Sequence, residues 1–120
     1  MIDQVTLLVV EDEALIRMDV VDQLESEGFR VLEASTADEA ISILGRDATV
    51  RIVLTDIDMP GSMDGLKLAA AVRDRWPPIQ IIVMSGHRTV EITDMPDGSV
   101  FFSKPYRHAI VMDSVNQMLA

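Results

Sequence analysis

Five short apolar runs divide the chain, and longer segments with a different pattern lie between them. The first and third runs are continuously apolar or β-branched, which is typical of strands that are covered on both faces of a parallel sheet. Turn-forming residues such as Gly28 and Pro77-Pro78 end the longer segments. The pattern predicts strands at residues 6–10, 29–32, 52–55, 80–84 and 99–102.

The segments between the runs carry apolar residues at the three- and four-residue spacing of one helix face. We expect helices at 14–27, 37–45, 66–76 and 108–119. In the first helix the apolar face would consist of Ala14, Met18, Val21 and Leu24. Thr36 and Glu39 form a capping-box pattern at the start of the second. Segment 87–95 is rich in β-branched residues, which are poor helix formers, and predicts only a short or loose helix.

Strands that alternate with helical segments predict an α/β domain, with a parallel sheet and helices on both of its faces. Short connections favour right-handed crossovers. We expect a doubly wound five-stranded sheet with strand order 2-1-3-4-5, the flavodoxin-like (βα)5 arrangement, in which the first and third strands are neighbours. The length of 120 residues fits a single domain, 1–120.

Composition excludes several classes of function. The formal net charge of −10 argues against direct nucleic-acid binding, because phosphate backbones attract basic surfaces. The chain has no cysteine, which excludes disulfides and thiolate sites. No apolar run approaches the roughly 20 residues that span a bilayer, and the first residues do not resemble a signal peptide. We therefore expect a cytoplasmic protein without a membrane partner.

Polar side chains stand at the ends of four predicted strands. Glu11 and Asp12 follow the first strand, Asp56 the third, Ser85 the fourth and Lys104 the fifth. Each of these residues alone would need no functional explanation, since Asp and Ser often open turns and most lysines are solvated. Together they should meet at one edge of the sheet, where ligands bind in such folds.

The convergence of Glu11, Asp12 and Asp56 indicates a cation site, because three close carboxylates repel one another strongly. Oxygen ligands without cysteine or nearby histidine favour a hard ion such as Mg²⁺, which keeps waters that a substrate phosphate can replace. The Lys104 ammonium could pair with Asp56 or with a bound phosphoryl oxygen. The Ser85 hydroxyl could donate a hydrogen bond to such an oxygen.

In this combination the chain resembles a response-regulator receiver domain of two-component signalling. The resemblance extends from Val5 to about Leu119. The motifs that carry it are Val10-Glu11-Asp12, Asp56-Ile57-Asp58-Met59-Pro60, Ser85-Gly86 and Lys104-Pro105.

The resemblance implies that Asp56 accepts a phosphoryl group from a phosphohistidine on a histidine kinase or phosphotransfer protein. It also implies a Mg²⁺ ion that Asp12 and Asp56 would bind directly, Glu11 through water, and Asp58 through its backbone carbonyl. The surface for the kinase would include residues 14–21 and 105–107. The chain would then be a phosphoacceptor that catalyses only its own phosphorylation and dephosphorylation, and not an enzyme with a separate substrate.

The resemblance further implies a switch. Ser85 would contact the phosphoryl group, Lys104 would pair with it, and the Lys104-Pro105 bond would be cis. Phe101 stands where the family most often has a tyrosine, so this switch residue could rotate but has no hydroxyl to bond. The repacked surface would consist of segments 87–95, 99–102 and 108–119. A downstream protein or a phosphorylation-dependent homodimer partner could bind there.

Two other functions remain as alternatives. Asp56-Ile57-Asp58 after an apolar strand also matches the nucleophile motif of the haloacid dehalogenase family, in which Asp58 would act as a general acid of a phosphohydrolase. Against this, the chain has no cap domain and its acidic pair follows the first strand instead of a later one. The second alternative is a receiver-like module that binds partners without phosphorylation.

Overall fold

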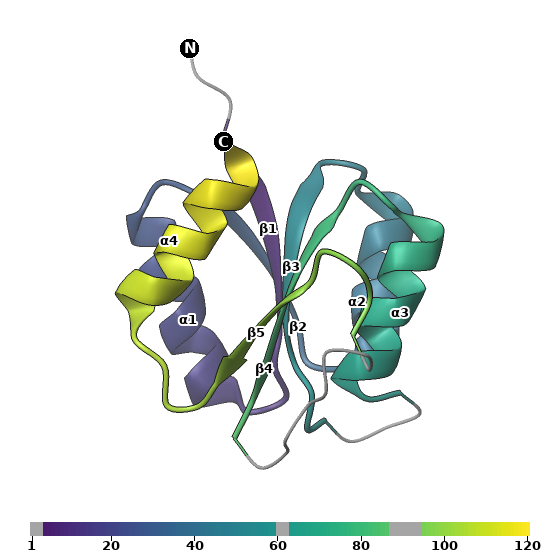
Figure 1. Cartoon of the computed structure of the whole chain (residues 1–120), viewed down its shortest axis with the longest axis horizontal. Helices are drawn as coiled ribbons and strands as arrows, with labels where there is room; N and C mark the ends of the chain where they lie inside the picture. Colours follow the sequence, from purple (N-terminus) through teal and green to yellow (C-terminus); the bar gives the residue numbers. More distant parts are fainter. Residues whose placement is uncertain (1–3, 60–62, 87–94) are drawn as a thin grey trace.

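A central five-stranded parallel sheet separates two layers of helices (Figure 1). The computed structural model describes residues 4–59, 63–86 and 95–120. The strands are β1 (Thr6–Val10), β2 (Arg30–Ala34), β3 (Val50–Asp56), β4 (Gln80–Ser85) and β5 (Val100–Ser103). Their order is β2-β1-β3-β4-β5 and every neighbouring pair is parallel, which confirms the predicted doubly wound α/β fold.

Among the described residues, two helices cover each face of the sheet. Within the described residues the helices are α1 (Ala14–Ser26), α2 (Ala37–Arg46), α3 (Gly65–Arg75) and α4 (His108–Leu119). Helices α1 and α4 lie on one face, and α2 and α3 on the other (Figure 1). The short helix expected at 87–95 falls almost entirely on residues 87–94, which lie outside the described residues. No described helix is long and apolar enough to cross a bilayer.

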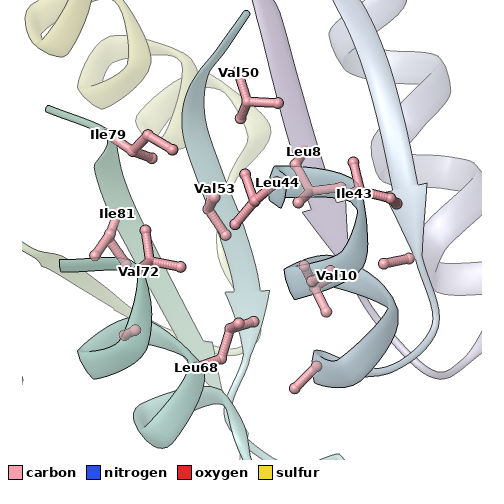
Figure 2. Packing of buried hydrophobic residues seen from close by; sticks show 14 of the residues in the cluster. Leu8, Val10, Ile43, Leu44, Val50, Val53, Leu68, Val72, Ile79 and Ile81 are labelled. Atoms are coloured by element: carbon pink, nitrogen blue, oxygen red, sulfur yellow. The ribbon is translucent and has the colours of Figure 1, made fainter. Parts of the chain in front are cut away.

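The alternating side chains of β1 divide the hydrophobic core into two clusters. Leu8 and Val10 pack toward α2 and α3, whereas Leu7 and Val9 pack toward α1 and α4. All four are fully buried, as expected for a strand that is covered on both faces. Figure 2 shows the first cluster, in which side chains of α2 and α3 meet those of β1, β3 and β4. This packing holds the strand ends in fixed positions.

Half of the predicted capping box is present at the start of α2, where Thr36 caps the helix but Glu39 bonds to Ser35 instead of the Thr36 N–H. The Thr36 hydroxyl accepts a hydrogen bond from the Glu39 backbone N–H at 3.1 Å. The Glu39 carboxylate reaches back to the hydroxyl and backbone N–H of Ser35, one residue before the cap. Thr36 therefore fixes the start of the helix, as the sequence predicted.

Helix α1 differs from the predicted pattern at Met18, which is 55% exposed instead of packed in the core. Ala14 is exposed as well, the buried residues of α1 are Val21 and Leu24, and Val20 is partly buried against the same core cluster. The Arg17 side chain is only 19% exposed and donates to the backbone carbonyl of Glu11. Arg17 is therefore a polar residue of α1 that is partly buried and has a structural partner.

Candidate functional site

The carboxylates predicted to converge do so at the carboxyl edge of the sheet. Asp56 is the last residue of β3 and Glu11 directly follows β1, its paired neighbour. Glu11, Asp12 and Asp56 each offer an oxygen atom, and these atoms lie within 4.8 Å of one another. The Glu11 and Asp56 residues are only 3% and 6% exposed. The three groups therefore form one acidic cluster that is partly shielded from water.

Lys104 faces this acidic cluster from the end of β5. Its Nζ lies 2.9 Å from Asp56 Oδ2 and 3.2 Å from Glu11 Oε1. Its backbone N–H donates to the Ser85 carbonyl at 2.9 Å, which continues the pairing of β4 with β5. The Lys104–Pro105 peptide bond is cis, as expected. One ammonium thus bridges carboxylates from β3 and from the residue after β1.

The electrostatics of the site follow from burial and crowding. Burial raises the pKa of Glu11 to about 7, and the hydrogen bond to Asp12 and the charge of Asp56 act in the same direction. Burial alone would lower the pKa of Lys104, but the hydrogen bond and charge of Asp56, together with Glu11, outweigh it and raise the pKa. At neutral pH Lys104 is therefore charged, while Glu11 keeps its proton to a higher pH than an ordinary glutamate does.

The chain after Asp56 is held against the neighbouring strand and helix. The Asp58 backbone N–H donates to Asp56 Oδ1 at 3.2 Å, and the Ile57 N–H donates to the Met84 carbonyl at 2.9 Å. Gly65, the first residue of α3, donates to the Ile57 carbonyl at 3.0 Å. Both oxygens of the Asp56 carboxylate therefore have a positively polarised neighbour, the Asp58 N–H on one side and Lys104 on the other.

The sequence profile of the response regulator receiver domain matches residues 7–116. The chain belongs to this family. It is 37% identical over 118 residues to the hydrogenase transcriptional regulatory protein HoxA of Cupriavidus necator, covering 95% of this chain and 24% of HoxA. It is 30% identical to the transcriptional regulatory protein ResD of Bacillus subtilis, covering 98% of this chain and 49% of ResD. The receiver thus spans about a quarter of the first relative and half of the second.

Solved structures agree with this assignment. A response regulator receiver protein from Sinorhizobium medicae superposes with a TM-score of 0.91 at 31% identity, over 98% of this chain and 95% of that one. The receiver domain of the hybrid histidine kinase CckA gives a TM-score of 0.79 at 29% identity, over 96% and 99% of the two chains. The family assignment goes against the haloacid dehalogenase alternative.

The donor atoms of this receiver fit a hard divalent cation. The acidic cluster offers carboxylate oxygens only, and Mg²⁺ takes oxygen ligands. Burial is the main cause of the raised pKa of Glu11, so a cation bound there would offset charge that is shielded from water. The residues present could therefore hold Mg²⁺.

Ser85 has a partner that the sequence analysis did not predict. Its hydroxyl donates to Asp58 Oδ2 at 2.9 Å, and the serine is only 2% exposed. The adjacent strand residue Phe101 is partly buried against the cluster under α2 and α3. Ser85 and Phe101 thus lie on neighbouring strands, β4 and β5, where Ser85 pairs with Ser103 and Phe101 with Val83.

Two further residues that shape the site were also missed. Arg17 ties the Glu11 carbonyl to the Glu33 carboxylate, with distances of 2.8 and 2.9 Å. A Cβ atom at Gly65 would lie 2.1 Å from the Asp56 carbonyl oxygen, so only glycine fits where α3 approaches β3. Sequence offered a weak signal for Gly65, since it follows an Asp that could cap a helix, and none for the pairing of Arg17 with a backbone carbonyl.

Proposed function

We propose that this receiver accepts a phosphoryl group on Asp56 from a phosphohistidine, in a reaction that requires Mg²⁺. The observation that carries the proposal is the position of Asp56 at the end of β3, within the acidic cluster and in contact with Lys104. A carboxylate in this position can act as a nucleophile, and the Lys104 ammonium already offsets its charge before any phosphoryl group arrives. The donor would be a histidine kinase or a histidine phosphotransfer protein.

The chemical step is a transfer from nitrogen to oxygen. An Asp56 oxygen attacks phosphorus, the bond between phosphorus and the donor imidazole breaks, and the imidazole nitrogen keeps the electron pair. Lys104 then offsets charge on a phosphoryl oxygen. The Asp58 N–H, which donates to Asp56 Oδ1, keeps the carboxylate oriented at the sheet edge. Water attack on the acyl phosphate would later return Asp56 to its free form.

We assign the cation to Asp12 and Asp56 as direct ligands, to Glu11 through water, and to the backbone carbonyl of Asp58. When bound, Mg²⁺ would offset negative charge on the transferring oxygens. Glu11 must lose its proton to take part, and its pKa of about 7 allows this within the physiological range.

A groove beside Lys104 supports a protein as the phosphoryl donor. It has a volume of about 480 Å³ and lies between α1 and the chain after β5. Its lining includes Ile16, Val20, Pro105 and Tyr106. On α1, which lines one side of the groove, Leu15 and Met18 stand three residues apart and are 82% and 55% exposed, so two apolar side chains of one helix face are open to a partner. With a kinase that phosphorylates this chain, Leu15→Asp should slow transfer from the kinase and leave the reaction with acetyl phosphate unchanged.

Output would follow from the new charge at Asp56. Ser85 and Lys104 would turn toward the phosphoryl group, Phe101 would rotate inward, and the surface of β5 and α4 would repack. A downstream protein, or a second copy of the phosphorylated chain, would bind to that surface. We further propose a single cytoplasmic domain, 1–120, which binds neither nucleic acid nor membrane and acts on no separate substrate.

Intact mass spectrometry tests the proposed function. The wild type, incubated with acetyl phosphate and Mg²⁺, should gain one phosphoryl group, and EDTA should abolish the gain. Asp56→Asn should gain none, whereas Asp74→Asn, a change at an exposed position of α3, should behave as the wild type. If the wild type stays unmodified with acetyl phosphate and with a phosphorylated kinase, the binding module without phosphorylation replaces this proposal.

A further inference from the structure

The hydrogen bond between Ser85 and Asp58 joins two strand ends beside the acceptor. The Ser85 hydroxyl donates to Asp58 Oδ2 at 2.9 Å. Ser85 is the last residue of β4 and Asp58 lies two residues beyond β3, so the bond links the ends of neighbouring strands. Ser85 is 2% exposed, and burial strengthens a bond to a charged acceptor.

A serine hydroxyl has one proton to donate. While that proton is directed to the Asp58 carboxylate, it is not available to an oxygen on Asp56. The backbone N–H of the same residue donates to Asp56 Oδ1 at 3.2 Å. Asp58 therefore contacts the acceptor through its backbone and restrains Ser85 through its side chain.

We propose that Asp58 is a positioning residue that holds the Ser85 hydroxyl in the unphosphorylated arrangement and so opposes the phosphorylated state. This inference rests on the proposed function of Asp56. Phosphorylation must break the bond between Ser85 and Asp58 before Ser85 can donate to the phosphoryl group. The bond therefore shifts the equilibrium between the two states toward the unphosphorylated one.

The charge of Asp58 acts on the site as well, and the experiment must separate charge from the hydrogen bond. Asp58→Asn removes the charge and keeps an amide oxygen that can accept from Ser85. Asp58→Ala removes the charge and the acceptor. The two variants therefore differ in the bond to Ser85 but not in charge.

The test is a titration with beryllium fluoride, a non-hydrolysable phosphoryl mimic, at saturating Mg²⁺, with the bound species followed by fluorine NMR. We expect Asp58→Ala to bind the mimic about two- to tenfold more tightly than Asp58→Asn, the factor that the loss of one hydrogen bond to a neutral acceptor supplies. In a Ser85→Ala background the two Asp58 variants should bind equally, because no hydroxyl remains to be held.

Equal affinities of Asp58→Ala and Asp58→Asn in the presence of Ser85 would overturn the inference, since charge alone would then explain any change. A urea unfolding cycle of Asp58→Ala and Ser85→Ala in EDTA tests the bond without the mimic, and additive losses would overturn it too. Failure of the proposed function looks different. No mimic would bind to any of the proteins, and the coupling in the urea cycle would persist.

Discussion

Gly65→Ala is the sharpest test of how the fold holds the acceptor. Gly65 begins α3, and its N–H donates to the Ile57 carbonyl directly after β3. An added Cβ would lie 2.1 Å from the Asp56 carbonyl oxygen and 2.7 Å from the Ile57 Cα. These are backbone atoms, so no side chain can rotate to make room. The start of α3 must move, or the end of β3 must.

The magnitude follows from the overlap. Carbon and oxygen atoms approach to about 3.3 Å even in the closest favourable contacts, so the backbones must separate by roughly 1 Å. Overpacking of this kind costs about 1–3 kcal/mol, and loss of the Gly65 hydrogen bond adds about 1 kcal/mol. Alanine has less conformational freedom than glycine in the unfolded chain, and this stabilises the folded protein by about 0.5–1 kcal/mol. We expect a net loss of about 1–3.5 kcal/mol in the free energy of unfolding.

Urea unfolding measures this loss, and Gly45→Ala is the matched control. Gly45 also lies in a helix, α2, and an added Cβ there meets no atom within 4 Å. The urea midpoint of Gly45→Ala should rise slightly, because alanine is more favourable than glycine inside a helix by about 0.5–1 kcal/mol. If Gly65→Ala unfolds at the same urea concentration as the wild type or a higher one, α3 does not approach Asp56 as closely as we describe.

Three further predictions concern charge and capping. In EDTA, the wild type should lose stability relative to Glu11→Gln as pH rises through about 7, because the folded pKa lies above the unfolded value of 4.5. The upper bound is about 3 kcal/mol at about 1.4 kcal/mol per pKa unit, and urea midpoints between pH 5 and 8 would show it. Lys104→Met should lower the melting temperature in EDTA, with a loss of about 2 kcal/mol of stability, because the shielded carboxylates of Glu11 and Asp56 lose the ammonium that pairs with them. Addition of Mg²⁺ should restore part of this stability. Thr36→Ala should cost about 1 kcal/mol in urea unfolding through the lost cap of α2.

The fold was predictable because its signals are local and repeated. Apolar runs of the right length marked all five strands, and the observed shifts are small, such as β2 at Arg30–Ala34 instead of 29–32. Strand pairing explains this shift, because Glu33 and Ala34 continue the parallel pairing with Val9 and Val10 of β1 although Glu33 is polar. Hydrophobicity reports burial, whereas the end of a strand is set by its neighbour.

The positions of the site residues were predictable for a related reason. In a parallel sheet the carboxyl ends of all strands lie at one edge, so Glu11, Asp56 and Lys104 had to meet once the strand order was known. The contacts within the site were not predictable. Whether the Ser85 hydroxyl turns to Asp58 or to Asp56 depends on a rotation about one bond, and no pattern in the sequence encodes that choice.

The site without a cation is short of positive charge, and this links metal binding to phosphorylation. Lys104 is the one ammonium that contacts the acidic cluster among the described residues, and it bridges two of the three carboxylates. Burial first, and then the hydrogen bond to Asp12 and the charge of Asp56, raise the pKa of Glu11 to about 7, so a proton can also offset part of the negative charge. A phosphoryl group on Asp56 would add negative charge where it is already in excess. If the proposed function holds, reciprocal linkage requires that phosphorylation would tighten Mg²⁺ binding by the same factor by which Mg²⁺ would favour the phosphorylated state.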